Sequence, residues 1–82
     1  MTDQELKASV LAALVAVAPE ANPAELRAQE PLRDQLDLDS FDFLRFIIGL
    51  HDRVGVDIPE SDYRNLGTLD DSVAYLRRRL PP

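Results

Sequence analysis

At residues 38–44 the chain reads Leu-Asp-Ser-Phe-Asp-Phe-Leu, which places a serine among acidic and apolar side chains. Asp39 is a residue type that caps helix N-termini, and the negative charge of Asp42 suits the positive end of a helix dipole. We therefore predict an amphipathic helix over residues 40–53. Ser40 would open that helix, where its hydroxyl group can serve as a cap or as a site that another enzyme modifies.

The segment before this stretch predicts one helix followed by a long loop. Thr2 and Glu5 have the spacing of a capping box, so we expect a helix to begin there. Prolines end it, and residues 19–37 are expected to form a loop in which residues 24–28 can make one helical turn. Loops of this length in a compact domain are often functional. The first helix has one apolar face, made of Leu6, Val10, Leu14 and Val17.

The segment after it predicts two more helices. Gly55 stops the helix of residues 40–53, and Pro59 suits the first turn of a short helix that carries Tyr63 and Leu66. Thr68 gives a second capping signal, and the last helix has an apolar stripe made of Leu69, Val73, Leu76 and Leu80. The predicted fold is all-α: a small four-helix bundle of three longer helices and one short helix, with the long loop between helices one and two.

Length and composition exclude several classes of protein. With 82 residues, the chain is expected to form a single domain over residues 1–82, too small for a large active-site cleft. The absence of cysteine and the single histidine argue against disulfides, a thiol nucleophile and a metal site. No stretch approaches the roughly 20 apolar residues that cross a bilayer, and the first residues lack a signal peptide's basic leader. We therefore expect a cytoplasmic protein without a membrane partner.

Negative charge is concentrated in the middle of the chain. The formal net charge is −6, and residues 30–71 contain eleven acids and four arginines. An acidic surface repels phosphate backbones, so nucleic acid is not expected as a partner. It attracts basic protein surfaces, or it simply keeps a small domain soluble. Three further arginines suit the negative end of the last helix, and they are Arg77, Arg78 and Arg79.

The residues around Ser40 fit a substrate better than a catalyst. A serine hydroxyl is a weak nucleophile without a base to activate it. The only histidine, His51, lies three turns further along the same predicted helix, where we expect a surface position. We therefore expect no catalytic residue, and Ser40 is interpreted as a group on which another enzyme acts.

These segments together resemble an acyl carrier protein. The family's attachment site for phosphopantetheine has an Asp-Ser pair followed by an apolar residue, as in Asp39-Ser40-Phe41. The similarity runs without gaps over residues 32–76, through Ile58-Pro59 before the short helix and Tyr75-Leu76 in the last helix. The tripeptide alone is weak evidence, but its combination with the other two pairs at family-like distances is specific.

The resemblance implies a carrier function. A phosphopantetheinyl transferase would move 4′-phosphopantetheine from coenzyme A onto Ser40, and acyl groups would be carried as thioesters on the thiol at the end of that arm. The expected partners are this transferase and the enzymes that load and process the acyl group. The chain would act as their substrate and not as an enzyme, and a monomer is expected.

A second apolar stripe on the predicted helix is a candidate docking surface. At about 100° per residue, most apolar side chains of the helix share one core face, whereas Phe41, Leu44 and Ile48 lie more than about 90° away from its centre. Exposed apolar patches mark interaction sites, so these residues can dock partner enzymes, unless the long loop covers them. The full set of expected docking residues is Asp39, Phe41, Asp42, Leu44, Arg45 and Ile48.

The sequence also departs from the family pattern. Arg45, His51 and Arg53 occupy positions where carriers of fatty-acid synthesis often have glutamate, and Asp37 stands where the family often has glycine. These departures leave the attachment chemistry intact. They favour a carrier dedicated to a specialised biosynthetic pathway over one that serves housekeeping fatty-acid synthesis.

Two other functions compete with this interpretation of the sequence. Asp37 and Asp39 begin like a calcium-binding EF-hand loop, but Phe41, Asp42 and Ile48 stand where a ligand, the glycine and the closing glutamate belong. The pattern therefore fails. The stronger alternative is a carrier-like helical bundle that is never modified and acts only as an adaptor by protein–protein interaction, because a fold does not fix a function.

Overall fold

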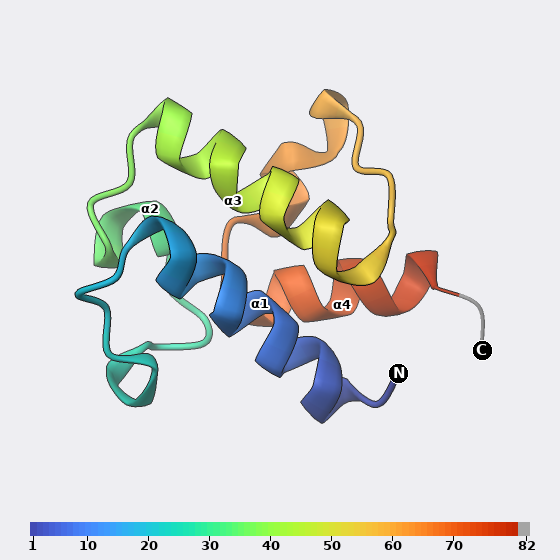
Figure 1. Ribbon diagram of the computed structural model, residues 1–82, viewed down its shortest axis with the longest axis horizontal. Coiled ribbons are helices and arrows are strands. Elements are labelled where there is room, and N and C mark those ends of the chain that lie inside the picture. Colours follow the sequence, from blue (N-terminus) through green and yellow to red (C-terminus); the bar gives the residue numbers. More distant parts are fainter. Residues whose placement is uncertain (81–82) are drawn as a thin grey trace.

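The computed structural model describes residues 1–80, and all regular secondary structure in that range is helical, with no strand (Figure 1). The elements in order are α1 (Asp3–Val17), η1 (Pro23–Glu25), α2 (Leu32–Gln35), α3 (Ser40–Val54), η2 (Glu60–Leu66) and α4 (Leu69–Arg79), where η marks a 3₁₀ helix. Three long helices and the shorter η2 form the bundle, so the predicted fold class is confirmed.

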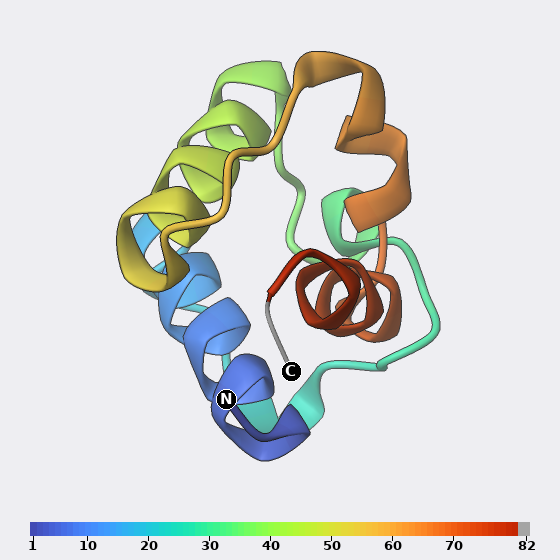
Figure 2. The same cartoon turned by 90° about the vertical axis from the view of Figure 1, so that its right-hand side faces the viewer.

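The three long helices surround one apolar core. Helices α1 and α3 lie side by side, and α4 packs against α1 (Figures 1 and 2). The short η2 packs against α4. Phe46 and Leu50 of α3 are completely buried between these helices. The rest of the fully buried large side chains come from every part of the chain: Leu6, Val10, Leu14, Leu32, Leu66 and Leu76.

The ends of the long helices follow the predicted signals. Thr2 caps α1 in a complete capping box with Glu5, and Thr68 caps α4 through a 3.0 Å bond that its hydroxyl oxygen accepts from the Asp71 N–H. Gly55 ends α3 in the left-handed conformation, with φ of 71°, which glycine adopts without strain. Helix α3 therefore begins and ends within a residue of its predicted bounds.

The segment between α1 and α3 is more ordered than a loop. It contains η1, which starts one residue before the predicted turn, and α2, which was not predicted. Leu32 of α2 is fully buried, and its backbone N–H donates a 2.8 Å hydrogen bond to the carbonyl of Gly67. A second bond, 3.0 Å long, runs from the Asp70 N–H to the Ala28 carbonyl. The segment is thus fastened to the start of α4 and supports the residues before Ser40.

Short polar contacts hold η2 against α4. The Tyr75 hydroxyl donates a 2.7 Å hydrogen bond to an Asp62 carboxylate oxygen, and the buried Ser72 hydroxyl donates a 3.2 Å bond to the Leu66 carbonyl. Burial and the neighbouring carboxylate raise the pKa of Tyr75 above its usual value, because both disfavour the phenolate. Within residues 1–80 no helix is both long and apolar enough to cross a membrane.

Candidate functional site

Ser40 is the first residue of α3 and is exposed to solvent. The helix cap beside it is Asp39, whose carboxylate accepts a 2.8 Å hydrogen bond from the Asp42 backbone N–H. Asp42 returns the interaction by accepting a 3.3 Å bond from the Asp39 N–H, which completes a capping box. Since Asp39 provides the cap, the Ser40 hydroxyl is not needed for it and is available to react with other groups.

The core face of α3 fixes the direction in which Ser40 is presented. Phe43, Phe46, Ile47 and Leu50 are buried, and the ring centroids of Phe43 and Phe46 lie 5.7 Å apart. These side chains hold one side of the helix against α1 and the core, so the helix cannot rotate without exposing them. The opposite side of its first turns, which carries the exposed Ser40, faces solvent.

Arg33 of α2 is the basic group nearest to Ser40, and the sequence did not single it out. One guanidinium nitrogen lies 3.4 Å from Ser40 Oγ, and Nε donates a 3.3 Å hydrogen bond to the Leu38 carbonyl. The guanidinium carbon also lies 5.9 Å from the centroid of the Phe43 ring. The sequence contains one feature that points to Arg33, namely its place directly after the apolar Leu32 in the expected loop. That feature becomes informative only once α2 is recognised as a helix.

Asp42 and Arg45 form an ion pair one turn into α3. The hydrogen bond from Arg45 and the bond from the Asp39 N–H both favour the charged carboxylate, so they lower the pKa of Asp42 below its usual value. Arg45 therefore offsets one of the two carboxylates that flank Ser40. Arg45, which stands where carriers of fatty-acid synthesis often have glutamate, therefore pairs with the capping residue Asp42 as well as making the surface charge less negative.

A groove opens beside Ser40, between the start of α3, the α2 segment and η2. Its volume is about 950 Å³, and Phe43 and Tyr63 lie on its walls with their rings 6.3 Å apart in an edge-to-face arrangement. Apolar and charged groups both line it. The other lining residues are Pro31, Arg33, Asp34, Asp37, Leu38, Ser40 itself, Leu44, Glu60, Arg64 and Gly67.

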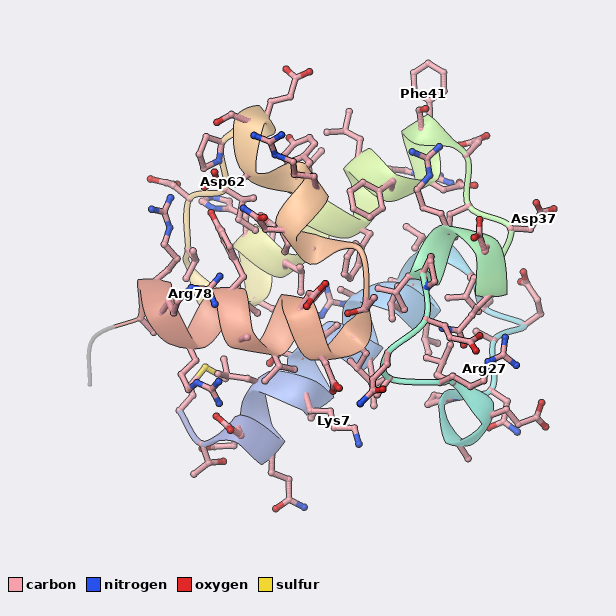
Figure 3. The ribbon with its side chains drawn as sticks, turned by 180° about the vertical axis from the view of Figure 1, so that it is seen from behind. Lys7, Arg27, Asp37, Phe41, Asp62 and Arg78 are labelled. Carbon is pink, nitrogen blue, oxygen red and sulfur yellow. The ribbon has the colours of Figure 1, made fainter. Side chains whose placement is uncertain are left out.

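The second apolar stripe of α3 is exposed. Phe41 is 78% exposed, Ile48 51% and Leu44 39%, and together with Met1 they are the exposed large apolar side chains of the described residues. Figure 3 shows the Phe41 ring projecting away from the ribbon at the start of α3. The segment of residues 18–39 does not cover these side chains, although Leu44 is partly covered where it reaches the groove.

Asp37 adopts the left-handed backbone conformation, with φ of 53°, and is the single non-glycine residue of the described chain with a positive φ. Its side chain extends outward from the segment before α3 (Figure 3). This explains why glycine suits the position, since only residues without a β-carbon avoid the steric cost, and aspartate is among the next best tolerated. The turn at Asp37 brings Leu38 into the core and Asp39 to the helix start.

The remaining basic residues of α3 lie away from the candidate site. His51 is exposed, as expected, and its Nδ1 lies 3.0 Å from the Val56 carbonyl and 3.4 Å from an Asp57 carboxylate oxygen. Arg53 donates a 3.2 Å hydrogen bond to the Gly49 carbonyl. Neither residue contacts Ser40, and the described residues contain no group of three or more side chains arranged to hold a metal ion.

Comparisons with known proteins agree on one family. Residues 9–76 match the family model described as "Phosphopantetheine attachment site". The chain is 30% identical over 73 residues to an acyl carrier protein of Myxococcus xanthus, covering 85% of this chain and 92% of that protein. It is also 30% identical over 78 residues to the meromycolate extension acyl carrier protein of Mycobacterium tuberculosis, covering 95% and 67% of the two chains.

A solved structure agrees with the sequence comparisons. A proposed acyl carrier protein from Anaplasma phagocytophilum, determined in solution, superimposes with a TM-score of 0.84 at 27% sequence identity. The similarity covers 99% of this chain and 94% of that one, so it includes both the helices and the segment of residues 18–39.

Proposed function

The chain belongs to the acyl carrier protein family, and we propose that it carries acyl groups on a phosphopantetheine arm attached to Ser40. Phosphopantetheine is the group that this family's attachment site takes. The observation that carries the assignment to Ser40 is its exposed hydroxyl at the start of α3, beside a helix cap that Asp39 provides independently. When bound, the arm supplies a thiol on which acyl groups are held as thioesters.

The surroundings of Ser40 fit a phosphate-linked group. The hydroxyl is accessible, the helix N-terminus favours negative charge through its dipole, and Arg33 places a guanidinium beside the oxygen. Asp39 and Asp42 oppose a phosphate electrostatically, but Asp42 is paired with Arg45. The groove next to the site has the apolar rings of Phe43 and Tyr63 on its walls and room for a small organic group.

The attachment step uses Ser40 as the nucleophile. The Ser40 Oγ–P bond forms while a P–O bond of the coenzyme A pyrophosphate breaks, adenosine 3′,5′-bisphosphate leaves, and the hydroxyl proton passes to a base. Among the described hydrogen bonds, the Ser40 hydroxyl has only the Arg33 guanidinium as a side-chain partner, and that group is a donor. The flanking carboxylates of Asp39 and Asp42 are engaged in the capping box, and His51 contacts residues 56 and 57. We therefore assign the base to the phosphopantetheinyl transferase, with the chain acting as its substrate.

Partner enzymes dock, in this proposal, on the exposed stripe beside Ser40. Phe41, Leu44 and Ile48 give the start of α3 an apolar surface, and Asp39, Asp42 and Arg45 provide charge around it. A partner that binds this surface reaches the Ser40 hydroxyl at the same time. The transferase and the enzymes that load and process the acyl group would share the surface, as expected for a monomeric carrier.

We place the carrier in a specialised pathway. Several similar proteins are named for meromycolate extension, which is one such role among carriers, and the arginines of α3 distinguish this helix from an acidic docking helix. Arg45 is the one that matters for docking, because it flanks the stripe at the start of α3. Arg53 lies near the other end of the helix with its guanidinium on the Gly49 carbonyl.

Intact-protein mass spectrometry tests the attachment. The chain would be incubated with coenzyme A and a broad-range phosphopantetheinyl transferase, and we expect the mass to increase by one phosphopantetheine, mapped to Ser40 by peptide analysis. Ser40→Ala should abolish the increase and leave the helical circular dichroism and melting temperature nearly unchanged, because Asp39 still caps α3. Ser72→Ala is unsuitable as a control because Ser72 is buried, so Ser9→Ala serves instead. An unmodified wild type would favour the adaptor that acts without an arm.

A further inference from the structure

We propose that Arg33 binds the phosphodiester of the arm once Ser40 has been modified, and thereby orients the arm toward the groove between α2, α3 and η2. The inference rests on the proposed attachment to Ser40. Its basis is the position of the guanidinium, which lies 3.4 Å from the oxygen that would become the bridging oxygen of the phosphodiester.

The structure holds the Arg33 side chain in place by contacts that do not involve an arm. Nε donates to the Leu38 carbonyl at 3.3 Å, and the guanidinium lies over the Phe43 ring at 5.9 Å. Both partners are themselves fixed, because Leu38 and Phe43 are buried in the core. An arginine oriented in advance loses less conformational entropy on binding an anion than a freely moving side chain would.

Helix α2 sets the position from which Arg33 reaches the site. The neighbouring Leu32 is fully buried and bonded through its N–H to the Gly67 carbonyl, so Arg33 cannot move away from the start of α3 without disturbing that anchor. The Leu38 N–H also donates a 3.0 Å hydrogen bond to the Arg33 carbonyl. Backbone and side chain of Arg33 are therefore both tied to Leu38, the residue that precedes the Asp39-Ser40 pair.

The charges around Ser40 make one arginine especially important. Asp39 lies next to Ser40, and Asp34 and Asp37 line the same groove as Arg33. Asp42 is engaged by Arg45, while Arg64 and Glu60 of η2 line the groove with no contact to Ser40 among the described hydrogen bonds. A new phosphodiester would add a negative charge to this acidic region, and Arg33 is the cation already in contact with its attachment point.

The chemistry of the guanidinium suits a phosphodiester. Its planar set of N–H donors matches the two non-bridging oxygens of the phosphate, and Nε–Leu38 uses only one of those donors. Binding on this side would direct the arm toward the groove and away from Phe41 and Ile48, because Arg33 lines the groove and those two residues do not. Phe41 and Ile48 would then stay accessible to partners while the arm rests beside η2 and next to Leu44, which lines the groove.

A thermal-stability cycle tests the role of Arg33. Melting temperatures would be measured for the unmodified and the modified forms of the wild type, Arg33→Gln and Arg64→Gln, at low salt. We expect modification to raise the wild-type melting temperature by about 2–4 °C, because one partly exposed charge-assisted contact is gained. The rise should persist in Arg64→Gln, which removes an arginine from the same groove, and should vanish in Arg33→Gln. It should also shrink at about 0.5 M salt, which screens the contact.

Nuclear magnetic resonance provides a second readout that needs no variant. In the wild type the Arg33 Nε–H resonance should shift on modification, and the resonance of Arg78, which is exposed on α4 outside the groove, should not. Equal rises in melting temperature for the wild type and Arg33→Gln, or an unmoved Arg33 resonance, would overturn the inference about Arg33. A wild type that gains no mass with coenzyme A and the transferase would overturn the attachment itself, so the two failures can be told apart.

Discussion

Truncation of Phe41 separates a docking role from a structural role most clearly. About a fifth of the side chain is covered, since 78% is exposed, and full burial of a large apolar side chain stabilises by about 1.5–3 kcal/mol, so Phe41→Ala should cost about 0.3–0.6 kcal/mol. That corresponds to a fall of about 1–5 °C in melting temperature for a domain of this size. The fold should therefore survive this change almost intact.

The same side chain should matter much more for modification. If a transferase buries the exposed four fifths of Phe41, the variant loses about 1.2–2.3 kcal/mol of binding, which lowers kcat/KM for the transfer by about sevenfold to fiftyfold. The rate would be followed by intact mass at several concentrations of the carrier, with coenzyme A saturating. Melting temperatures of the same samples would be read by circular dichroism.

Leu50→Ala is the opposite case and serves as the control. Leu50 is fully buried in α3, so its truncation should cost about 2–5 kcal/mol and lower the melting temperature by at least about 8 °C. Below its melting temperature, this variant should still be modified at nearly the wild-type rate. The reasoning fails if Phe41→Ala destabilises the protein as much as Leu50→Ala, or if it leaves the transfer rate unchanged.

Two further changes follow from the region around Ser40. Asp37→Gly should stabilise the protein by on the order of 0.5 kcal/mol in urea unfolding, because relief of the left-handed strain exceeds the entropy that glycine loses on folding. Asp37→Val should destabilise the protein, and a lower stability of the glycine variant would contradict this account. Arg45→Glu should increase turnover with an acyl-processing enzyme of general fatty-acid synthesis, because it makes the docking face more acidic. Arg78→Glu changes the net charge by the same amount on the exposed side of α4 and should leave this turnover unchanged. Equal turnover in the two variants would remove local charge as the basis of partner choice.

The helices of the fold could be predicted because their ends carry local signals. Capping residues at Thr2, Asp39 and Thr68 and the stop at Gly55 act within a few residues of themselves, so the sequence alone contains them. Helix α2 gives no such signal: its cap position is Pro31, which makes no side-chain bond, and its single turn is held by the distant Gly67 carbonyl. Tertiary contact, and not local preference, stabilises this helix.

The residues of the candidate site likewise divide into those that local signals predict and those that depend on tertiary contacts. Ser40, its cap and the apolar stripe lie on one helix, so their relative positions follow from helical periodicity and were predicted. The long segment before α3 does not cover the stripe, as the docking hypothesis requires, but Leu44 is the least exposed of its three residues. At 39% exposure, Leu44→Ala should cost about 1–2 kcal/mol, which makes it a poorer probe of docking than Phe41. Arg33 was missed because its approach to Ser40 depends on α2.

The reciprocal cap between Asp39 and Asp42 has a consequence for the life of the protein in a cell. Because the helix start is complete without Ser40, a copy without an arm should already be stably folded, and the arm should add only the small stability of its Arg33 contact. Proteases and chaperones, which act on unfolded chains, should therefore clear few of the inactive copies. Inactive copies would accumulate and compete with active ones for the same partner enzymes, so the balance between them would be set by the supply of coenzyme A and transferase and not by protein turnover.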